Sequence, residues 1–240
     1  MAVGSAESAS KPSPAGPTES APTLSEGGVH PQAQAAVAGG GAYLDEGSGD
    51  RLVLASYVDP VELIWIETAR KLGITVRRSD AVFASWDGGG ELTLSTRAGF
   101  DPDDCVAQLV LHEVCHALVE GPGAWSQPDW GLENIDERDL SREYAAQRLQ
   151  GRLSAAHGLR TLLAPTTKWR SYYDALPEDP LEGPDTDPAV PLARAAWRRA
   201  QQEPWHSSLQ QALAATAVIA QAVAPYAADG TLWRQVKPCL

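Results

Sequence analysis

The hydrophobic pattern divides the chain into a featureless beginning, a short region of mixed periods and a long helical remainder. Residues 1–48 are rich in Ala, Gly, Ser, Pro and Glu, and their few larger apolar residues show no period. Such a segment buries too little apolar surface to offset the entropy of ordering, so we expect a disordered tail at 1–48. Residues 49–240 then form the domain, which ends in two helices.

The first part of the domain shows segments with the two-residue period of strands beside segments with the helical period. The later part shows the helical period alone. Asp59-Pro60 and Asp101-Pro102 resemble helix starts, because Asp can cap a helix and Pro suits its first turn. Glu91 to Thr96 alternates polar and apolar residues, as a half-buried strand does. Mixed strands followed by helices are typical of an α+β fold. The predicted elements are a strand or lead-in at 51–58, a helix at 59–72, strands at 74–77, 81–85 and 91–96, and helices at 101–119, 139–157, 189–202 and 205–225.

Charge and composition limit the kinds of partner. The net charge of −12 argues against nucleic acid and against an anionic membrane surface. The sequence holds no run of eighteen apolar residues, and Met1 to Pro12 lacks the apolar core of a signal peptide. Three sparse cysteines, Cys105, Cys115 and Cys239, fit a reducing compartment, so we expect a cytoplasmic protein.

The sequence His112-Glu113-Val114-Cys115-His116 lies in the predicted helix 101–119. Residues four apart face the same side of a helix, so two imidazole nitrogens can converge on one ion. The carboxylate of Glu113 then lies where it can take a proton from a metal-bound water. Two histidines and a glutamate in a largely apolar helix also need polar partners. The motif therefore predicts one catalytic divalent metal, with Glu113 as the general base.

A catalytic metal site needs a third protein ligand and an open position. We favour Glu143, because it belongs to the predicted helix 139–157 and small Ala145 and Ala146 would let that helix approach the motif helix closely. The alternative is a solvated glutamate paired with a nearby Arg. Glu137 is the next choice and Asp129 also remains open. The acidic residues that follow the motif are Asp129, Glu133, Asp136, Glu137, Asp139 and Glu143.

The motif with a later helical glutamate resembles the zincin metallopeptidases of the gluzincin type, over about residues 81–157. The resemblance implies a small mixed or antiparallel sheet packed on the metal-binding helix, with strand 91–96 as the edge strand that aligns a substrate. It also implies His112, His116 and Glu143 as ligands and Glu113 as general base. The metzincin branch is excluded, because Val119 and Pro122 stand where its Gly and third His would fall.

A second resemblance is to the elongation factor P hydroxylase family. It rests on Gly99-Phe100, on the motif helix, and on Asp129 and Gly131 after the second histidine. This family implies Fe(II) and O₂ chemistry, for which two histidines and one carboxylate are a typical ligand set. The structural alternative for Asp129-Trp130-Gly131 is a turn whose Asp and Gly serve the backbone geometry.

These observations favour a metal-dependent hydrolase of a peptide or protein substrate. Its expected cofactor is one divalent metal, Zn²⁺ first and Fe²⁺ as the alternative. The alternatives in function are an iron-dependent hydroxylase and an inactive zincin-like scaffold used for binding, which would not need to keep Glu113. No motif marks a His or Tyr that would stabilise a transition state. The candidates by residue type are Tyr144, Tyr172, Tyr173 and His206, and the alternative for each is a structural or surface role.

Overall fold

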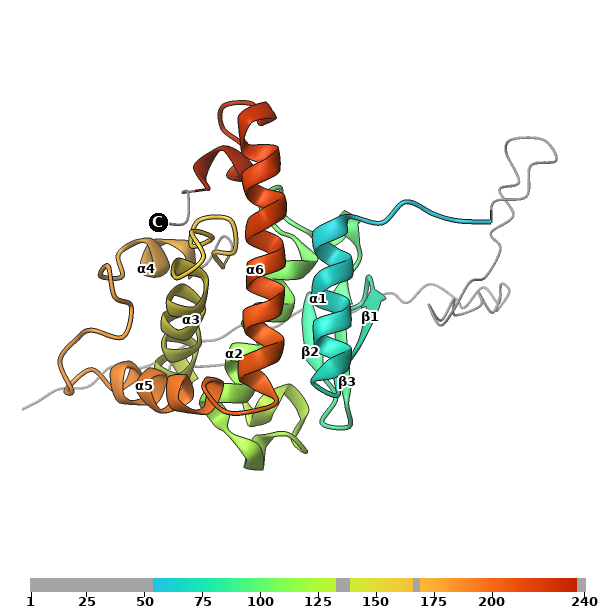
Figure 1. Ribbon diagram of the computed structural model, residues 1–240. Coiled ribbons are helices and arrows are strands. Elements are labelled where there is room, and N and C mark those ends of the chain that lie inside the picture. Colours follow the sequence, from blue (N-terminus) through green and yellow to red (C-terminus); the bar gives the residue numbers. More distant parts are fainter. Residues whose placement is uncertain (1–53, 133–138, 166–168, 237–240) are drawn as a thin grey trace, which may run out of the picture. The chain divides into compact units, whose positions relative to one another are not determined.

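The computed structural model describes residues 54–132, 139–165 and 169–236, and it confirms an α+β fold with a three-stranded mixed sheet. Figure 1 shows the labelled elements. The predicted tail at 1–48 lies outside the described residues. The helices are α1 (Pro60–Lys71), α2 (Val106–Glu120), α3 (Leu140–Ala155), α4 (Arg170–Asp174), α5 (Ala189–Ala200) and α6 (Trp205–Val223), and the strands are β1 (Thr75–Ser79), β2 (Ala84–Trp86) and β3 (Glu91–Ser95).

The sheet has the order β1-β3-β2, so the strand nearest the motif helix in sequence is the central one. β3 pairs with β1 in parallel and with β2 in antiparallel register. The expectation that strand 91–96 forms an edge is therefore wrong. The turn after Asp87 reverses the chain, so that β3 runs antiparallel beside β2. β1 pairs with the other side of β3. β1 and β2 are therefore the two outer strands of the sheet, and β2 spans only Ala84–Trp86.

One of the two helix starts predicted from an Asp-Pro pair is present in the structure. Asp59 accepts hydrogen bonds from the N–H groups of Val61 (2.9 Å) and Glu62 (3.1 Å), as its sequence position predicted. The helix start that the same pattern predicted at Asp101 is wrong, because α2 begins at Val106. Asp104 accepts a hydrogen bond from the Asp101 N–H (2.7 Å) in a turn that precedes the helix. The Asp-Pro pair there starts a turn instead of a helix.

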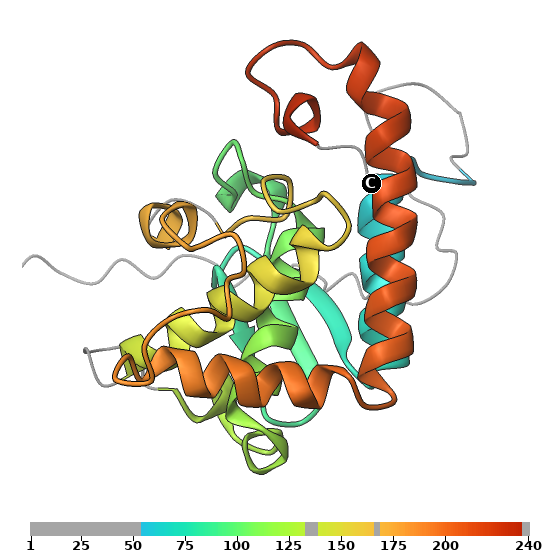
Figure 2. The same cartoon turned by 60° about the vertical axis from the view of Figure 1, so that its left-hand side comes forward.

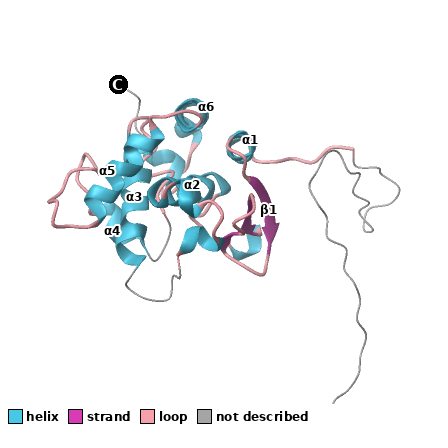
Figure 3. Ribbon diagram, turned by 90° about the horizontal axis from the view of Figure 1, so that it is seen from below, coloured by secondary structure: helices cyan, strands magenta, loops and turns pink. Residues whose placement is uncertain are grey.

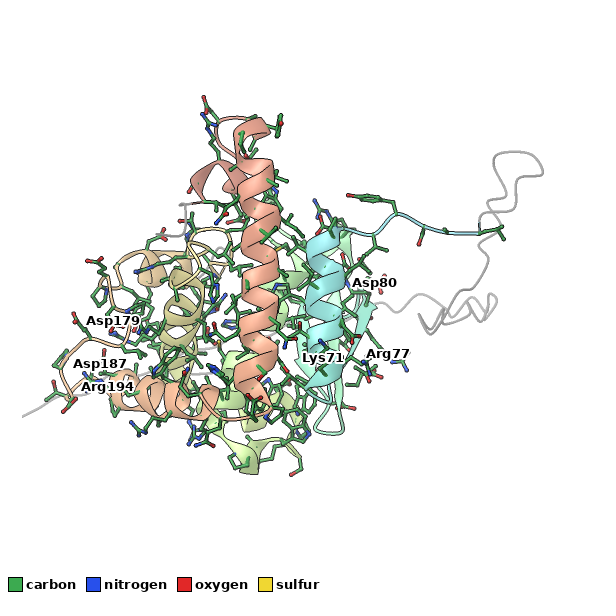
Figure 4. All side chains as sticks on the ribbon, in the orientation of Figure 1. Lys71, Arg77, Asp80, Asp179, Asp187 and Arg194 are labelled. Carbon is green, nitrogen blue, oxygen red and sulfur yellow. The ribbon has the colours of Figure 1, made fainter. Side chains whose placement is uncertain are left out.

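The other differences from the predicted elements are local. Residues 54–58 form no strand, and the rest of the predicted strand at 51–58 is not described. The strand predicted at 81–85 is confined to Ala84–Trp86. The short helix α4 falls in a segment for which no element was predicted. The sequence rich in Pro and acidic residues that follows it is held to α3, because the Arg148 guanidinium donates to the carbonyls of Pro180 (2.9 Å) and Glu182 (3.0 Å) and to Asp187 (2.9 Å). Figure 4 labels Asp187 on this connection and Arg194 on α5.

Helix α2 lies at the centre of the helical packing. It packs against α1, α3 and α5, and α6 packs along α1 (Figures 1 and 2). In Figure 3 the strands lie to one side of these helices, next to α1. All but two residues of α2 are buried, so its polar side chains have to find partners inside the protein. Among the described residues, no helix combines the length and apolar character that a membrane crossing requires.

Candidate metal centre

Three side chains from α2 and α3 converge on one point. The Nε2 atoms of His112 and His116 lie 3.1 Å apart. The Glu143 carboxylate lies 3.4 Å from the first nitrogen and 3.1 Å from the second. Ligand atoms of all three residues lie within 4.8 Å of one another. His112 is half-buried and the other two are buried, so this is a preassembled group of two imidazoles and one carboxylate that could hold a metal ion.

The predicted packing of α3 against α2 is present in the structure. Ala145 and Ala146 are completely buried, and the two helices pack directly against each other. Glu143 in the first turn of α3 therefore reaches the histidine pair instead of solvent. The alternative in which Glu143 is a solvated surface residue is contradicted by its burial.

Two glutamines on α3 hold His112 and Glu143 in place. Gln150 donates its amide N–H to the carbonyl of Leu163 (2.7 Å), so its oxygen must face His112 Nδ1 at 2.9 Å. This hydrogen bond requires a proton on Nδ1 and leaves a lone pair on His112 Nε2, the atom that points to the site. Gln147 donates to Glu143 Oε1 at 2.9 Å. Both contacts fix the orientation of groups that a metal would need.

The charges of the site favour a cation at its centre. Burial lowers the pKa of His116, but the carboxylates of Glu143 and Glu113 and the hydrogen bond to Glu143 together raise that pKa above its ordinary value. Burial raises the pKa of Glu143, but the two histidines and the hydrogen bonds from His116 and Gln147 hold that pKa well below its usual range. A proton on His116 therefore stabilises the group, and a divalent cation competes with that proton for the same nitrogen.

Glu113 is not part of the three-residue group and is held by a separate hydrogen bond. The indole N–H of Trp130 donates to Glu113 Oε2 at 2.9 Å. Trp130 is itself buried and stacks on Trp86, with ring centroids 4.3 Å apart and planes 6° from parallel. Glu113 also lines the cavity that contains the histidine pair. One oxygen of the Glu113 carboxylate is therefore fixed at the wall of that cavity.

The loop that carries Trp130 has an unusual backbone. Asp129 and Trp130 have φ values of 46° and 59°, and Gly131 follows with 78°. Positive φ is uncommon for residues other than glycine, and each such residue costs of the order of 1–3 kcal/mol. The Asp129 carboxylate anchors the loop by accepting hydrogen bonds from Ser85 Oγ and the Trp86 N–H, both at 3.0 Å. Asp129 thus serves the backbone geometry, and in the described structure its carboxylate is not part of the ligand group.

The remaining candidates lie elsewhere or outside the described residues. Glu133, Asp136 and Glu137 belong to 133–138, which the structure does not describe. Asp139 stands at the N-cap position of α3. His157 contacts Gln210 through Nε2 at 3.1 Å. The cavity wall contains no tyrosine among the described residues, so Tyr144, Tyr172 and Tyr173 are not positioned there to stabilise a transition state.

A cavity of about 270 Å³ opens onto the candidate ligands. Its lining combines the two histidines and both glutamates with several apolar side chains. The lining residues are Phe83, Ala84, Gln108, Leu109, His112, Glu113, His116, Glu143, Pro165 and Trp169. The cavity therefore gives a small molecule or a single side chain access to the site.

Sequence reasoning missed the supporting residues Gln147, Gln150 and Trp130. The two glutamines follow Glu143 at intervals of four and seven residues, so they lie on the same helix face. These two glutamines could have been predicted as supporting residues. They share a helix face with Glu143, the favoured ligand, and that helix was predicted to pack closely against the motif helix. The contact of Trp130 with Glu113 had no such signal, because it depends on the left-handed loop.

The hydrogen bond from Trp130 to Glu113 should have a measurable effect on stability. Trp130→Phe removes the donor and keeps an aromatic ring next to Trp86. Trp125→Phe is the matched control, since this ring also contacts Trp86 but has no hydrogen bond to Glu113. In urea unfolding, Trp130→Phe should lower the free energy of unfolding by about 1.5–3 kcal/mol more than the control, because Glu113 loses its donor. Equal losses would show that the contact contributes no net stability.

Comparisons with protein-family models, curated proteins and solved structures found no match to this chain.

Proposed function

We propose that the protein is a zinc-dependent hydrolase of peptide or amide bonds with a zincin-like active site. The observation that carries this proposal is the convergence of His112, His116 and Glu143 in a cavity that Glu113 also lines. Two histidines and one carboxylate leave an open position on zinc, as catalytic zinc sites do.

The residues present fit a metal ion well. His112 Nε2 carries a lone pair because Gln150 fixes the proton on Nδ1, and the Glu143 carboxylate is held in its charged form. Two nitrogens and two oxygens that face one another at 3.1–3.4 Å need a proton or a cation between them. A divalent cation in this group would lower the pKa of water towards about 7 and polarise a carbonyl group.

Each side chain then has a defined task in hydrolysis. His112, His116 and Glu143 would hold the ion, and Gln150 and Gln147 fix the orientations of His112 and Glu143 respectively. Glu113 accepts the proton of the attacking water and returns it to the leaving amine. Trp130 holds one oxygen of Glu113, so the carboxylate presents the other to the cavity. The substrate enters beside β2, one of the two outer strands, because Phe83 and Ala84 line the cavity.

Metal content and turnover test the proposal together. Protein purified without oxygen should contain about one zinc per chain when metals are quantified by mass spectrometry. A mixture of quenched fluorogenic peptides should be cleaved at equal rates with and without O₂. Treatment with 1,10-phenanthroline should abolish cleavage, and added zinc should restore it.

Two other results would assign a different function. The same ligand set is typical of non-haem iron enzymes, so bound iron with O₂-dependent turnover would replace hydrolysis by hydroxylation. Bound zinc with no cleavage of any peptide in the mixture would contradict the proposal and favour an inactive scaffold that binds its partner.

A further inference from the structure

Gln108 is a buried polar side chain that the ligand group does not use. It lies on α2 one turn before His112, so both residues lie on the same face of the helix. Its exposed fraction is 2%, and it lines the cavity. Its amide oxygen makes no hydrogen bond within the described part of the chain. Buried polar atoms nearly always have partners, so this oxygen is suited to accept a hydrogen bond from a ligand.

The cavity wall next to Gln108 is apolar and contains an exposed aromatic ring. Phe83 precedes β2 and is 48% exposed, and Leu109 follows Gln108 on α2. A large ring left half-exposed beside a polar site is typical of a surface that binds an apolar group. The Phe83 ring makes an edge contact with the ring of Phe100, with 6.3 Å between the ring centroids.

The charged groups near this wall do not favour a charged ligand side chain. Within the described lining, the ionisable residues are the three candidate ligands and Glu113. Arg78, whose guanidinium lies over the ring of Phe100, donates to Glu62 at 3.0 Å and to the Ser95 carbonyl at 2.7 Å. That guanidinium is already paired, so it is not available to recognise an acidic ligand.

We propose that Gln108 and Phe83 form a specificity subsite that binds a neutral amide bearing an apolar side chain. Gln108 accepts a hydrogen bond from the N–H of the amide that follows the apolar residue of the ligand, and the side chain of that residue lies against Phe83. The cavity of about 270 Å³ has room for one side chain and its adjoining amide. This inference rests on the proposed function and narrows its substrate to a peptide with an apolar residue next to the reacting carbonyl.

Binding of small amides to the zinc-loaded protein tests the subsite without any turnover. The first probe is N-acetyl-phenylalanine amide, and the second is its N,N-dimethylamide, which lacks the terminal N–H groups. Isothermal titration should show about tenfold tighter binding of the first probe, because an acceptor left without its donor lowers affinity. N-acetyl-aspartate amide should bind at least tenfold more weakly than the phenylalanine amide.

Variants of Gln108 and Phe83 separate the two parts of the subsite. Gln108→Met conserves the side-chain length and should reduce the preference for the N–H amide to about one. Phe83→Ala should keep that preference and weaken the binding of both phenylalanine probes. Gln211→Met makes the same change on an exposed face of α6 and should alter neither the preference for the N–H amide nor the affinity for the phenylalanine probes. A merely structural Gln108 would change the affinity for both amides equally.

The outcomes distinguish this inference from the proposed function. An unchanged N–H preference in Gln108→Met, or equal binding of the apolar and acidic probes, would overturn the subsite even where peptides are cleaved. Selective amide binding that depends on Gln108 in a protein without hydrolytic activity would support the subsite and remove the proposed hydrolase.

Discussion

Glu113→Gln should leave the metal content unchanged and lower the rate of peptide cleavage by about 10²–10⁴-fold, the range typical of a lost general base. The amide oxygen of Gln can still accept the Trp130 indole hydrogen bond, so packing around the site is conserved. Gln lacks a basic oxygen and cannot take the proton of the attacking water. The measurements are kcat on the fluorogenic peptide mixture and zinc per chain.

The comparison with a second glutamate makes the result specific. Glu67→Gln changes the same side chain on the exposed side of α1, where Glu67 pairs with Arg70. That variant should keep both zinc and kcat. If Glu113→Gln retains full cleavage, Glu113 is not the general base, and another group must accept the proton. If it loses zinc as well, Glu113 supports the ligand group and its separate role is wrong.

The helices could be predicted more completely than their contacts. Asp59 caps α1 because its side chain is free to reach the next N–H groups. The same pattern at Asp101 misled, because Asp104 turns back to the Asp101 N–H and the helix begins only after Cys105. Capping patterns identify a residue that can cap, but they do not show whether the residues after it form a turn or the first turn of a helix.

The order of the strands in the sheet could not be predicted from the sequence pattern. Alternation in β3 marks a strand with one buried face, and Leu92 and Leu94 are indeed fully buried. Alternation does not say which strands lie on either side. The parallel pairing of β1 with β3 joins residues such as Thr75 and Glu91 that are separated by β2 in sequence. Such pairing is decided by tertiary packing.

The parts of the candidate site that depend on residues close in sequence could be predicted, and the parts that depend on distant residues could be predicted only in part. His112 and His116 are brought together by one turn of helix, so their spacing alone predicts the pair. Glu143 required a guess about helix packing that small residues made reasonable. The link between Trp130 and Glu113 needed two left-handed residues other than glycine, which no sequence rule predicts.

His112→Ala combined with His116→Ala should abolish metal binding. The variant removes both nitrogen ligands, and Glu143 alone cannot hold zinc in a site of this kind. Zinc at about 100 times its dissociation constant should stabilise the native wild-type protein by about 2.7 kcal/mol. The same addition should leave the variant unchanged. Thermal unfolding with added zinc and with chelator measures both effects.

The appropriate control is the double variant His157→Ala with His206→Ala, which removes two histidines outside the group. It should retain one zinc per chain and the full zinc-dependent increase in Tm. Loss of folding in the site variant would be visible as lost helical signal before any metal is added. In that case His112→Gln, which keeps a polar side chain opposite Gln150, replaces it and should still bind zinc far more weakly. Zinc content equal to wild type in a folded site variant would show that the metal binds elsewhere, and the proposed hydrolase would lose its basis.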